Sequence, residues 1–310
     1  LVAIASSAVC AWAVWIHSFW LLTLATLAAG YYNANGALYR FAAVELVPPQ
    51  AKEKAISWVL AGGVMGAVLG PNLASGTRDA LAQAPFAGAY AALMVVGLIA
   101  LVVMSRIPFD PLPGQGSTQA AGRPTGEIVR QPLFLIAAAA CAIGYGVMNL
   151  LMAATPIAMA QCAHPFSAAA LVLEWHVLAM VVPSFFTGKL IQRWGVLPVM
   201  TLGLLLSIGC VAFALSGEDL NHFLGALVVL GLGWNFLYIG GSALATQTWA
   251  PEEKTRAQAA LDFCVYATMT LSSFSSGALV TTGGWTAMNL GSLLPLAVLA
   301  AALIWLARLQ

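Results

Sequence analysis

The feature that most constrains this chain is a succession of apolar segments, each long enough to cross a lipid bilayer as a helix. A spanning helix needs about 17–25 mostly apolar residues. The segments lie near residues 1–16, 18–45, 55–75, 86–105, 132–158, 166–186, 197–216, 222–249, 257–280 and 283–308. They are continuously apolar and do not alternate in two-residue steps, as the strands of a membrane barrel do. We therefore predict an all-α integral membrane protein with ten transmembrane helices.

Composition agrees with this prediction and narrows the possible functions. Hydrophobic residues make up 61% of the chain and charged residues 7%, against about 25% charged residues in an average soluble domain. The net charge of +1 favours no nucleic-acid partner. The five cysteines form no CxxC pair, and nucleotide-binding, hydrolase and zinc-protease motifs are absent from the sequence. We expect no cofactor, no metal and no enzymatic chemistry.

The basic residues indicate the orientation of the helices, because positive loops stay in the cytoplasm. Only Arg78, beside Asp79, falls on the side opposite to the other basic loop residues. Those others are Lys52, Lys54, Arg106, Arg123, Arg130, Lys189, Arg193, Lys254, Arg256 and Arg308. The predicted location is a bacterial inner membrane with a cytoplasmic C-terminus.

One charged loop occurs twice in the chain. The heptapeptides 49–55 (PQAKEKA) and 251–257 (PEEKTRA) lie 202 residues apart, since 251 − 49 = 202. At the same offset, Asn33 corresponds to Asn235 and Tyr32 to Trp234. Both loops are basic, so the two halves of the chain are parallel repeats.

The repeat also predicts the domain organisation. Residues 1–106 form an incomplete N-terminal bundle, residues 107–131 a flexible cytoplasmic linker rich in Pro, Gly and Ser, and residues 132–310 a C-terminal bundle. The second half begins near Gln131, and 131 − 202 = −71, so its counterpart would begin about 70 residues before Leu1. We expect a native protein of twelve helices, six plus six, of which this chain has helices 3–12.

The loop Gly188–Gly195 (GKLIQRWG) resembles the signature G-x-L-x-D-R-x-G of the major facilitator superfamily, with Gln192 in place of Asp. Gly188 and Gly195 would let two helix ends approach each other, and Arg193 would pair with helix carbonyls. The alternative is an ordinary basic turn. The resemblance implies two helical bundles that alternate access to a central site.

A second stretch, Gly66-Ala-Val-Leu-Gly70-Pro71, is similar to the G-x-x-x-G-P motif of drug:proton antiporters in that superfamily. Gly66 and Gly70 share one helix face and permit close packing, while Pro71 permits a bend. Tight packing without any antiporter function is the alternative. The sequence departs from the antiporter pattern in another helix, where the only arginine, Arg40, lies near the cytoplasmic end.

Ionisable residues inside membrane helices are candidates for proton coupling, because burial is costly for their charged forms. Glu174 is the first candidate and Asp262 the second. Glu174 and His176 point about 200° apart on a helix, so they do not share one face. We also expect an ion pair between Arg40 and Asp262 that closes the cytoplasmic side. A structural pair with a neighbouring helix is the alternative for Glu174, and a structural role is favoured for His176.

Polar and aromatic residues within the spans are candidates for lining a substrate cavity. These residues are Tyr31, Tyr32, Asn33, Asn35, Tyr145, Asn149, His176, Trp234 and Asn235. Hydrogen bonding between helices is the alternative for the asparagines. The predicted function is proton-coupled export of a small, partly apolar molecule by a monomer in the bilayer, with a small-molecule substrate and protons as its partners. Proton-symport uptake of a metabolite and a non-transporting membrane subunit are the alternatives.

Overall fold

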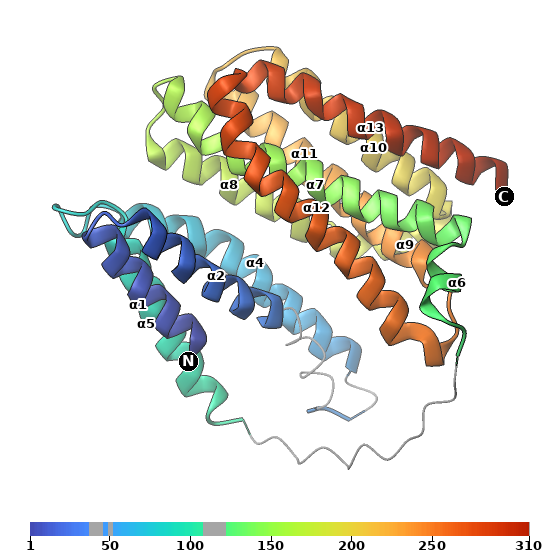
Figure 1. The fold of residues 1–310 in the computed structure, drawn as a ribbon, viewed down its shortest axis with the longest axis horizontal. Coiled ribbons are helices and arrows are strands. Elements are labelled where there is room, and N and C mark those ends of the chain that lie inside the picture. Colours follow the sequence, from blue (N-terminus) through green and yellow to red (C-terminus); the bar gives the residue numbers. More distant parts are fainter. Residues whose placement is uncertain (37–45, 49–51, 108–121, 310) are drawn as a thin grey trace. The chain divides into compact units, whose positions relative to one another are not determined.

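A computed structural model describes residues 1–36, 46–48, 52–107 and 122–309 (Figure 1). These ranges contain helices joined by turns and no strand. The chain divides into two compact units, Leu1–Gly116 and Ser117–Gln310, and each is described by itself. The all-helical class predicted from the apolar segments is confirmed.

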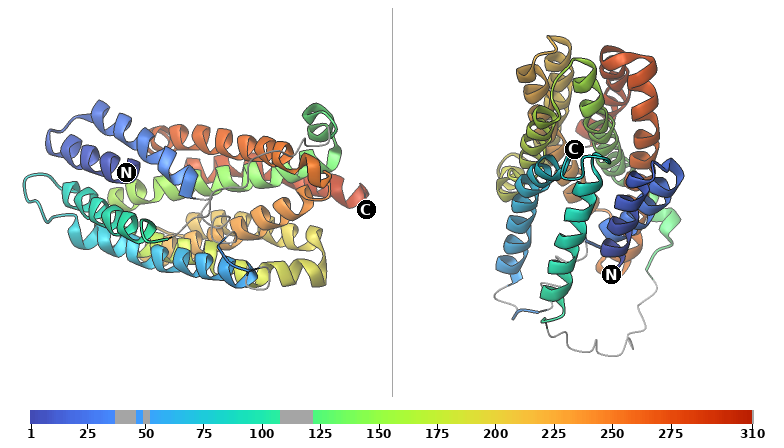
Figure 2. Two further views of the ribbon diagram at one scale, coloured as in Figure 1. Left: turned by 90° about the horizontal axis from the view of Figure 1, so that it is seen from below. Right: turned by 90° about the vertical axis from the view of Figure 1, so that its left-hand side faces the viewer.

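Unit 1 contains four described helices: α1 (Val2–Trp15), α2 (Phe19–Gly36), α4 (Lys52–Thr77) and α5 (Ala87–Met104). Helix α1 packs against α2 and α5, and α4 packs against α5 (Figures 1 and 2). The buried face of α1 is made of the small residues Ser6, Cys10 and Ala13, spaced three and four apart. Small residues at this spacing let membrane helices approach closely.

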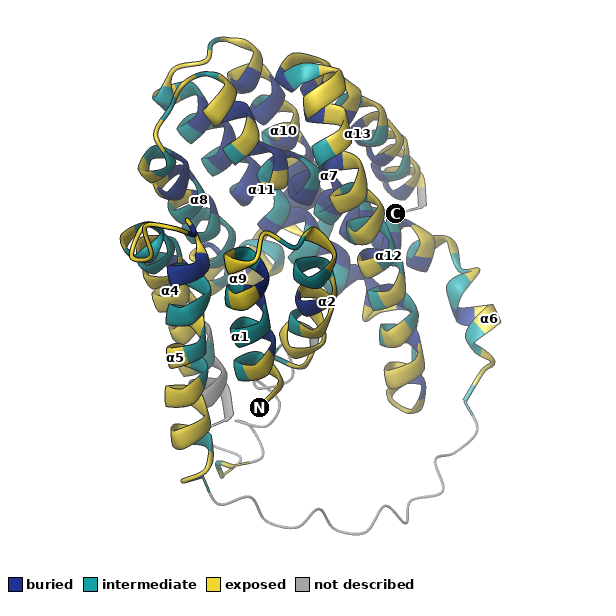
Figure 3. Cartoon of the chain, turned by 60° about the vertical axis from the view of Figure 1, so that its left-hand side comes forward, coloured by how far each residue is buried: buried dark blue, intermediate teal, exposed yellow. Residues whose placement is uncertain are grey.

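Unit 2 contains the remaining helices. They are α6 (Thr125–Val129), α7 (Pro132–Gln161), α8 (Phe166–Val181), α9 (Ser184–Trp194), α10 (Val196–Leu215), α11 (Leu220–Ala245), the 3₁₀ turn η2 (Pro251–Glu253), α12 (Lys254–Thr282) and α13 (Gly284–Leu309). Helix α11 lies at the centre, in contact with α7, α8 and α10, while α7 also packs against α12 and α13. Buried positions follow α7 and α11 (Figure 3).

Glycines allow one close helix contact and one turn in unit 2. A Cβ on Gly203 of α10 would lie 2.9 Å from the carbonyl oxygen of Gly233 on α11, so this crossing tolerates no side chain there. Gly195 has φ +88°, which glycine adopts without strain, and it joins α9 to α10.

Two sequence predictions need correction or refinement. Six described helices are long and apolar enough to span a membrane, or seven if α8 and α9 form one span bent by 42°. The predicted count of ten is therefore not established, and α1, with 14 residues, is short for a span. In addition, the end of the predicted flexible linker is packed on unit 2, where α6 buries Ile128 completely.

Candidate functional site

Three aromatic rings from α7 and α11 form a cluster in unit 2. The rings of Trp234 and Tyr238, one helical turn apart on α11, stack with centroids 5.1 Å apart and an interplanar angle of 9°. Tyr145 of α7 meets both edge-on, at 5.3 Å from Trp234 and 5.6 Å from Tyr238. All three side chains are partly exposed, and the buried indole Nε1 of Trp234 has no hydrogen-bond partner among the described residues. The cluster therefore offers flat apolar surface beside a buried indole donor.

An amide lies one turn further along α7, where it meets two hydroxyls of α12. Asn149, four residues after Tyr145, donates from Nδ2 to the hydroxyls of Ser272 at 2.9 Å and Ser273 at 2.8 Å on α12. The same nitrogen lies 3.3 Å from the carbonyl oxygen of Met269. Asn149 therefore joins α7 to α12. Hydrogen bonding between helices is the alternative role that we consider for the asparagines. The network places polar groups close to the aromatic cluster along α7.

Asn235 is also a helix-bonding residue. Its side chain is fully buried, and its Nδ2 donates to the Met180 carbonyl and the Ser184 hydroxyl, each at 2.7 Å. Its Oδ1 accepts a hydrogen bond from Thr187 at 2.6 Å. These partners flank Pro183, where α8 ends and α9 begins. Asn235 thus stabilises the break between α8 and α9, where freed backbone groups need partners, and does not line a cavity as we predicted.

His176 and Glu174 face different surroundings, as their spacing predicted. His176 is fully buried, and its Nδ1 donates to the Leu227 carbonyl of α11 at 2.6 Å. Its Nε2 is buried without a hydrogen-bond partner in the described part of the chain. This placement matches the structural role considered for His176 and removes it from the surface of a cavity. Glu174 is partly exposed on α8.

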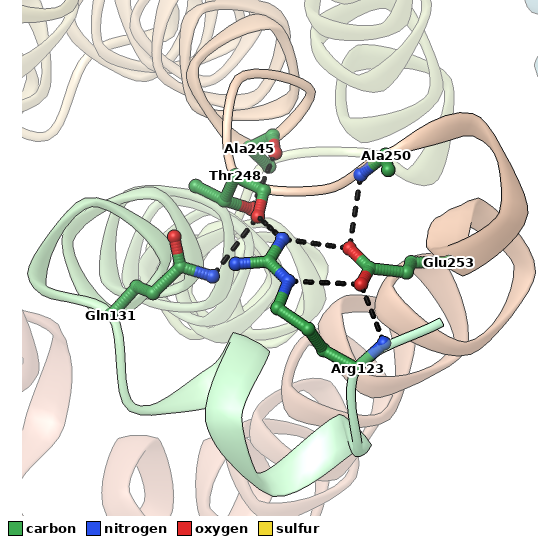
Figure 4. Close-up of polar contacts among 6 residues, drawn as sticks. All are labelled: Arg123, Gln131, Ala245, Thr248, Ala250 and Glu253. Carbon is green, nitrogen blue, oxygen red and sulfur yellow. Dashed lines mark hydrogen bonds and ion pairs between the residues drawn. The ribbon is translucent and has the colours of Figure 1, made fainter. Parts of the chain in front are cut away.

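A second polar cluster lies where α11 ends and α12 begins (Figure 4). Glu253 is almost fully buried and receives four hydrogen bonds. Arg123 donates to it from Nε at 2.9 Å, from Nη2 at 2.7 Å and from its backbone N–H at 2.7 Å. The backbone N–H of Ala250 donates the fourth at 3.0 Å. The hydrogen bond from the Arg123 side chain is the main cause that lowers the pKa of Glu253 to about 2, helped by the Ala250 N–H.

The same cluster binds the end of α11. The carbonyl oxygen of Thr248 accepts hydrogen bonds from Arg123 Nη2 at 3.1 Å and from Gln131 Nε2 at 3.0 Å. Gln131 directly precedes α7. The segments before α7, after α11 and before α12 are therefore joined in one hydrogen-bonded cluster, which we call the Arg123–Glu253 clamp.

The sequence comparison decides the family. A model of the Major Facilitator Superfamily matches residues 137–310, which is more than half of the chain. The chain belongs to the major facilitator superfamily. As a member of this superfamily it is a multi-pass integral membrane transporter and not an enzyme.

Three curated relatives within the superfamily cover nearly the whole chain. The riboflavin transporter RfnT of Brucella anthropi is 42% identical over 294 residues, which are 93% of this chain and 73% of the relative. The MFS-type transporter YddS of Bacillus subtilis is 26% identical over 313 residues, covering 95% of this chain and 72% of the relative. YdeG of the same organism is 28% identical over 309 residues, covering 94% and 71%.

A solved structure shows the same fold. A bacterial homologue of the iron transporter ferroportin, crystallised in an outward-facing state, aligns with 99% of this chain and 84% of its own, at a TM-score of 0.57 and 15% identity. At this identity the likeness concerns the superfamily fold alone.

The superfamily signature lies at the end of α9. Arg193 is exposed in the last helical turn, Gly188 is exposed, and Gly195 makes the left-handed turn into α10. In unit 1, Pro71 lies inside α4, and a Cβ on Gly66 or Gly70 would meet no atom of the described residues within 4 Å. The packing role predicted for these two glycines remains a prediction.

The other predicted site residues lie in unit 1 or on α12. Tyr31, Tyr32, Asn33 and Asn35 are exposed near the end of α2, and Asn35 donates to the Tyr31 carbonyl at 2.8 Å. Tyr32 also lines a hollow of about 150 Å³ between α1, α2 and α5. Asp262 is partly exposed on α12. Arg40 lies outside the described residues, so its ion pair with Asp262 remains a prediction.

Sequence reasoning missed several members of these clusters. Tyr238 follows Trp234 by four residues, a spacing that would have indicated a shared helix face. Glu253 could have been noticed by aligning the two loops, because the first copy has Ala51 at that position. Arg123 carried no such signal, because nothing in a linker sequence shows which buried carboxylate it meets.

Proposed function

We propose that this protein transports a flat heteroaromatic metabolite of the riboflavin class across a bacterial cell membrane. The observation that carries the proposal is the cluster of Tyr145, Trp234 and Tyr238 close to the Asn149 amide. Ligand sites combine flat apolar surface with a few polar groups that fix orientation. The 42% identity to a riboflavin transporter supports this substrate class.

The chemistry of the two clusters complements such a substrate. A riboflavin-like molecule has a planar tricyclic ring with carbonyl and nitrogen acceptors along one edge, and a hydroxylated chain. Stacking or edge-on contact with Tyr145 or Tyr238 would hold the ring. The Nε1–H of Trp234 would donate to an acceptor on the ring, and the Ser272 and Ser273 hydroxyls would bind the hydroxylated chain.

Alternating access is the mechanism that we propose, with the two bundles rocking about a central site. Glu174 remains the first candidate for proton coupling and Asp262 the second. For the direction we favour uptake, the alternative that the sequence had raised beside export. A vitamin-like metabolite is consumed inside the cell, whereas export would suit an amphipathic drug.

Growth of a riboflavin auxotroph tests the proposal. The full chain is expressed in a bacterium that neither makes nor imports riboflavin, and growth and radiolabelled uptake are followed at low external riboflavin. Growth that requires the chain, and that fails with Trp234→Ala at equal membrane abundance, supports the proposal. Expressed protein that restores neither growth nor uptake contradicts it.

The coupling ion needs a separate measurement. Right-side-out membrane vesicles with an imposed pH gradient, acid outside, are given riboflavin from the outside, and the gradient is followed with and without Glu174→Gln. Dissipation on adding riboflavin that the substitution abolishes supports proton coupling through Glu174. Dissipation that survives the substitution moves the coupling role to Asp262, and riboflavin transport with no effect on the gradient contradicts proton coupling.

A further inference from the structure

The Arg123–Glu253 clamp joins three segments, because a buried carboxylate before α12 meets donors from the segments before α7 and after α11. Glu253 is 2% exposed, and a buried charge is stable only when paired and hydrogen-bonded. The guanidinium meets the carboxylate through two nitrogens, Nε and Nη2, the geometry in which arginine pairs most strongly. The extra bonds from two backbone N–H groups fix the carboxylate further.

The three segments in the clamp lead directly into the helices that carry the candidate site. Arg123 and Gln131 precede α7, which carries Tyr145 and Asn149. Thr248 follows α11, which carries Trp234 and Tyr238. Glu253 immediately precedes α12, which carries Ser272 and Ser273. A change in the clamp therefore reaches all three helices at their ends.

We propose that Arg123 and Glu253 are positioning residues for transport, which hold α7, α11 and α12 in the register that the substrate site requires. A helix is rigid enough to carry a displacement at its end along its length, so a fixed end restricts the site. The clamp also holds residues 122–131 on unit 2.

The repeat shows that the clamp is a property of the second half. Its loop has Glu253 where the first copy has Ala51, whereas the basic residues and the final alanine of the two loops correspond. Orientation in the membrane requires only the basic residues. The carboxylate therefore serves another purpose, and it lies where Arg123 joins the segment before α7 to unit 2.

Transport kinetics in proteoliposomes, with riboflavin as the probe, test the proposal. This test rests on the proposed function, because it measures riboflavin transport. Arg123→Gln and Glu253→Gln are each expected to lower the maximal rate per folded protein by about tenfold, with little change in KM, as distant positioning contacts do. The double variant is expected to lose about tenfold as well, because the second substitution removes nothing further. Arg123→Lys keeps the charge without the two-nitrogen contact, so its maximal rate should lie between those of the wild type and Arg123→Gln.

Controls separate positioning from a contact needed only for folding. Glu252→Gln removes the adjacent, exposed carboxylate and should leave the rate unchanged. Rates per folded protein that stay at the wild-type value in both single variants would overturn the proposal. So would a double variant whose loss is the product of the single losses, about a hundredfold.

Hydrogen–deuterium exchange of the purified full chain gives a second readout that needs no substrate. In Glu253→Gln we expect faster exchange in residues 122–131 and also around Tyr145 and Trp234, at the candidate site. Faster exchange confined to the clamp itself would overturn the positioning role. Because this readout does not depend on riboflavin, failure of the proposed substrate and failure of the clamp are distinguishable.

Discussion

Helix α5 of unit 1 and helix α7 of unit 2 are both strongly apolar, but they bury very different shares of their residues. The most apolar stretch of α5 in unit 1 is 11% buried, whereas that of α7 in unit 2 is 67% buried. Both helices satisfy the requirement for crossing a bilayer. Apolarity alone therefore does not determine how much of a membrane helix is packed against its neighbours.

The same contrast separates residues that correspond in the repeat. Asn235 is fully buried with three hydrogen-bond partners, whereas Asn33, its counterpart in unit 1, is exposed. Unit 2 therefore uses its polar residues as structural links between helices. The predictions below test how far this difference between the units extends.

The largest effect is expected from removing the Asn235 side chain. Asn235→Leu removes the hydrogen bonds that Asn235 makes with Thr187, Ser184 and the Met180 carbonyl, which should lower the free energy of unfolding by about 3 kcal/mol. Asn33→Leu in unit 1 should change it little. Thermal unfolding of both variants in detergent checks the comparison, and equal losses would show that the units do not differ in this respect.

A functional prediction concerns Trp234 and its counterpart Tyr32. Trp234→Ala should raise the KM for riboflavin by about thirtyfold, equivalent to about 2 kcal/mol of binding, as expected for a central aromatic contact. Tyr32→Ala should raise it less, because Tyr32 lies outside the aromatic cluster. Trp234→Phe keeps a ring and removes the N–H, so its KM isolates the hydrogen bond. A larger effect at Tyr32 would place the main aromatic contact in unit 1.

Much of the fold could be predicted from the sequence, because membrane helices are read directly from apolar length. The segment predicted at 86–105 is α5 (Ala87–Met104), and that at 197–216 is α10 (Val196–Leu215). The segment predicted at 166–186 divides into α8 and α9 at Pro183. Hydropathy does not register such a break, since apolar residues continue through it.

The candidate site was predicted less completely. Polar or aromatic character within apolar helices predicts Tyr145, Asn149 and Trp234 as site residues, and the structure brings Tyr145 and Trp234 into contact. The same criterion predicts Asn235 and His176, yet both are buried between helices. When a helix is apolar all round, its sequence does not show which face meets a cavity and which meets a neighbouring helix.

A smaller effect is expected where glycine allows close packing. Gly203→Ala places a Cβ against the Gly233 carbonyl, and overpacking of this kind destabilises by about 1–3 kcal/mol. Gly66→Ala in unit 1 meets no described atom within 4 Å and should be neutral. Thermal unfolding of the two variants provides the measurement. Strong destabilisation by Gly66→Ala would show that this glycine has a close neighbour after all.

The smallest effect, and the most specific, is the pH dependence of the Arg123–Glu253 clamp. The pKa of Glu253 is about 2 in the folded protein, against 4.5 for an unperturbed glutamate such as that of the unfolded chain. The folded state therefore favours the ionised carboxylate. Its contribution to stability is therefore fully present above pH 4.5 and is lost as the pH falls towards 2. The difference in melting temperature between the wild type and Glu253→Gln should be constant between about pH 5 and pH 8, where Glu253 is ionised in both states, and shrink below that range. Glu252→Gln, which removes the exposed neighbour, should show no such trend. A difference that persists unchanged at low pH would mean that the carboxylate charge is not what holds the clamp in unit 2.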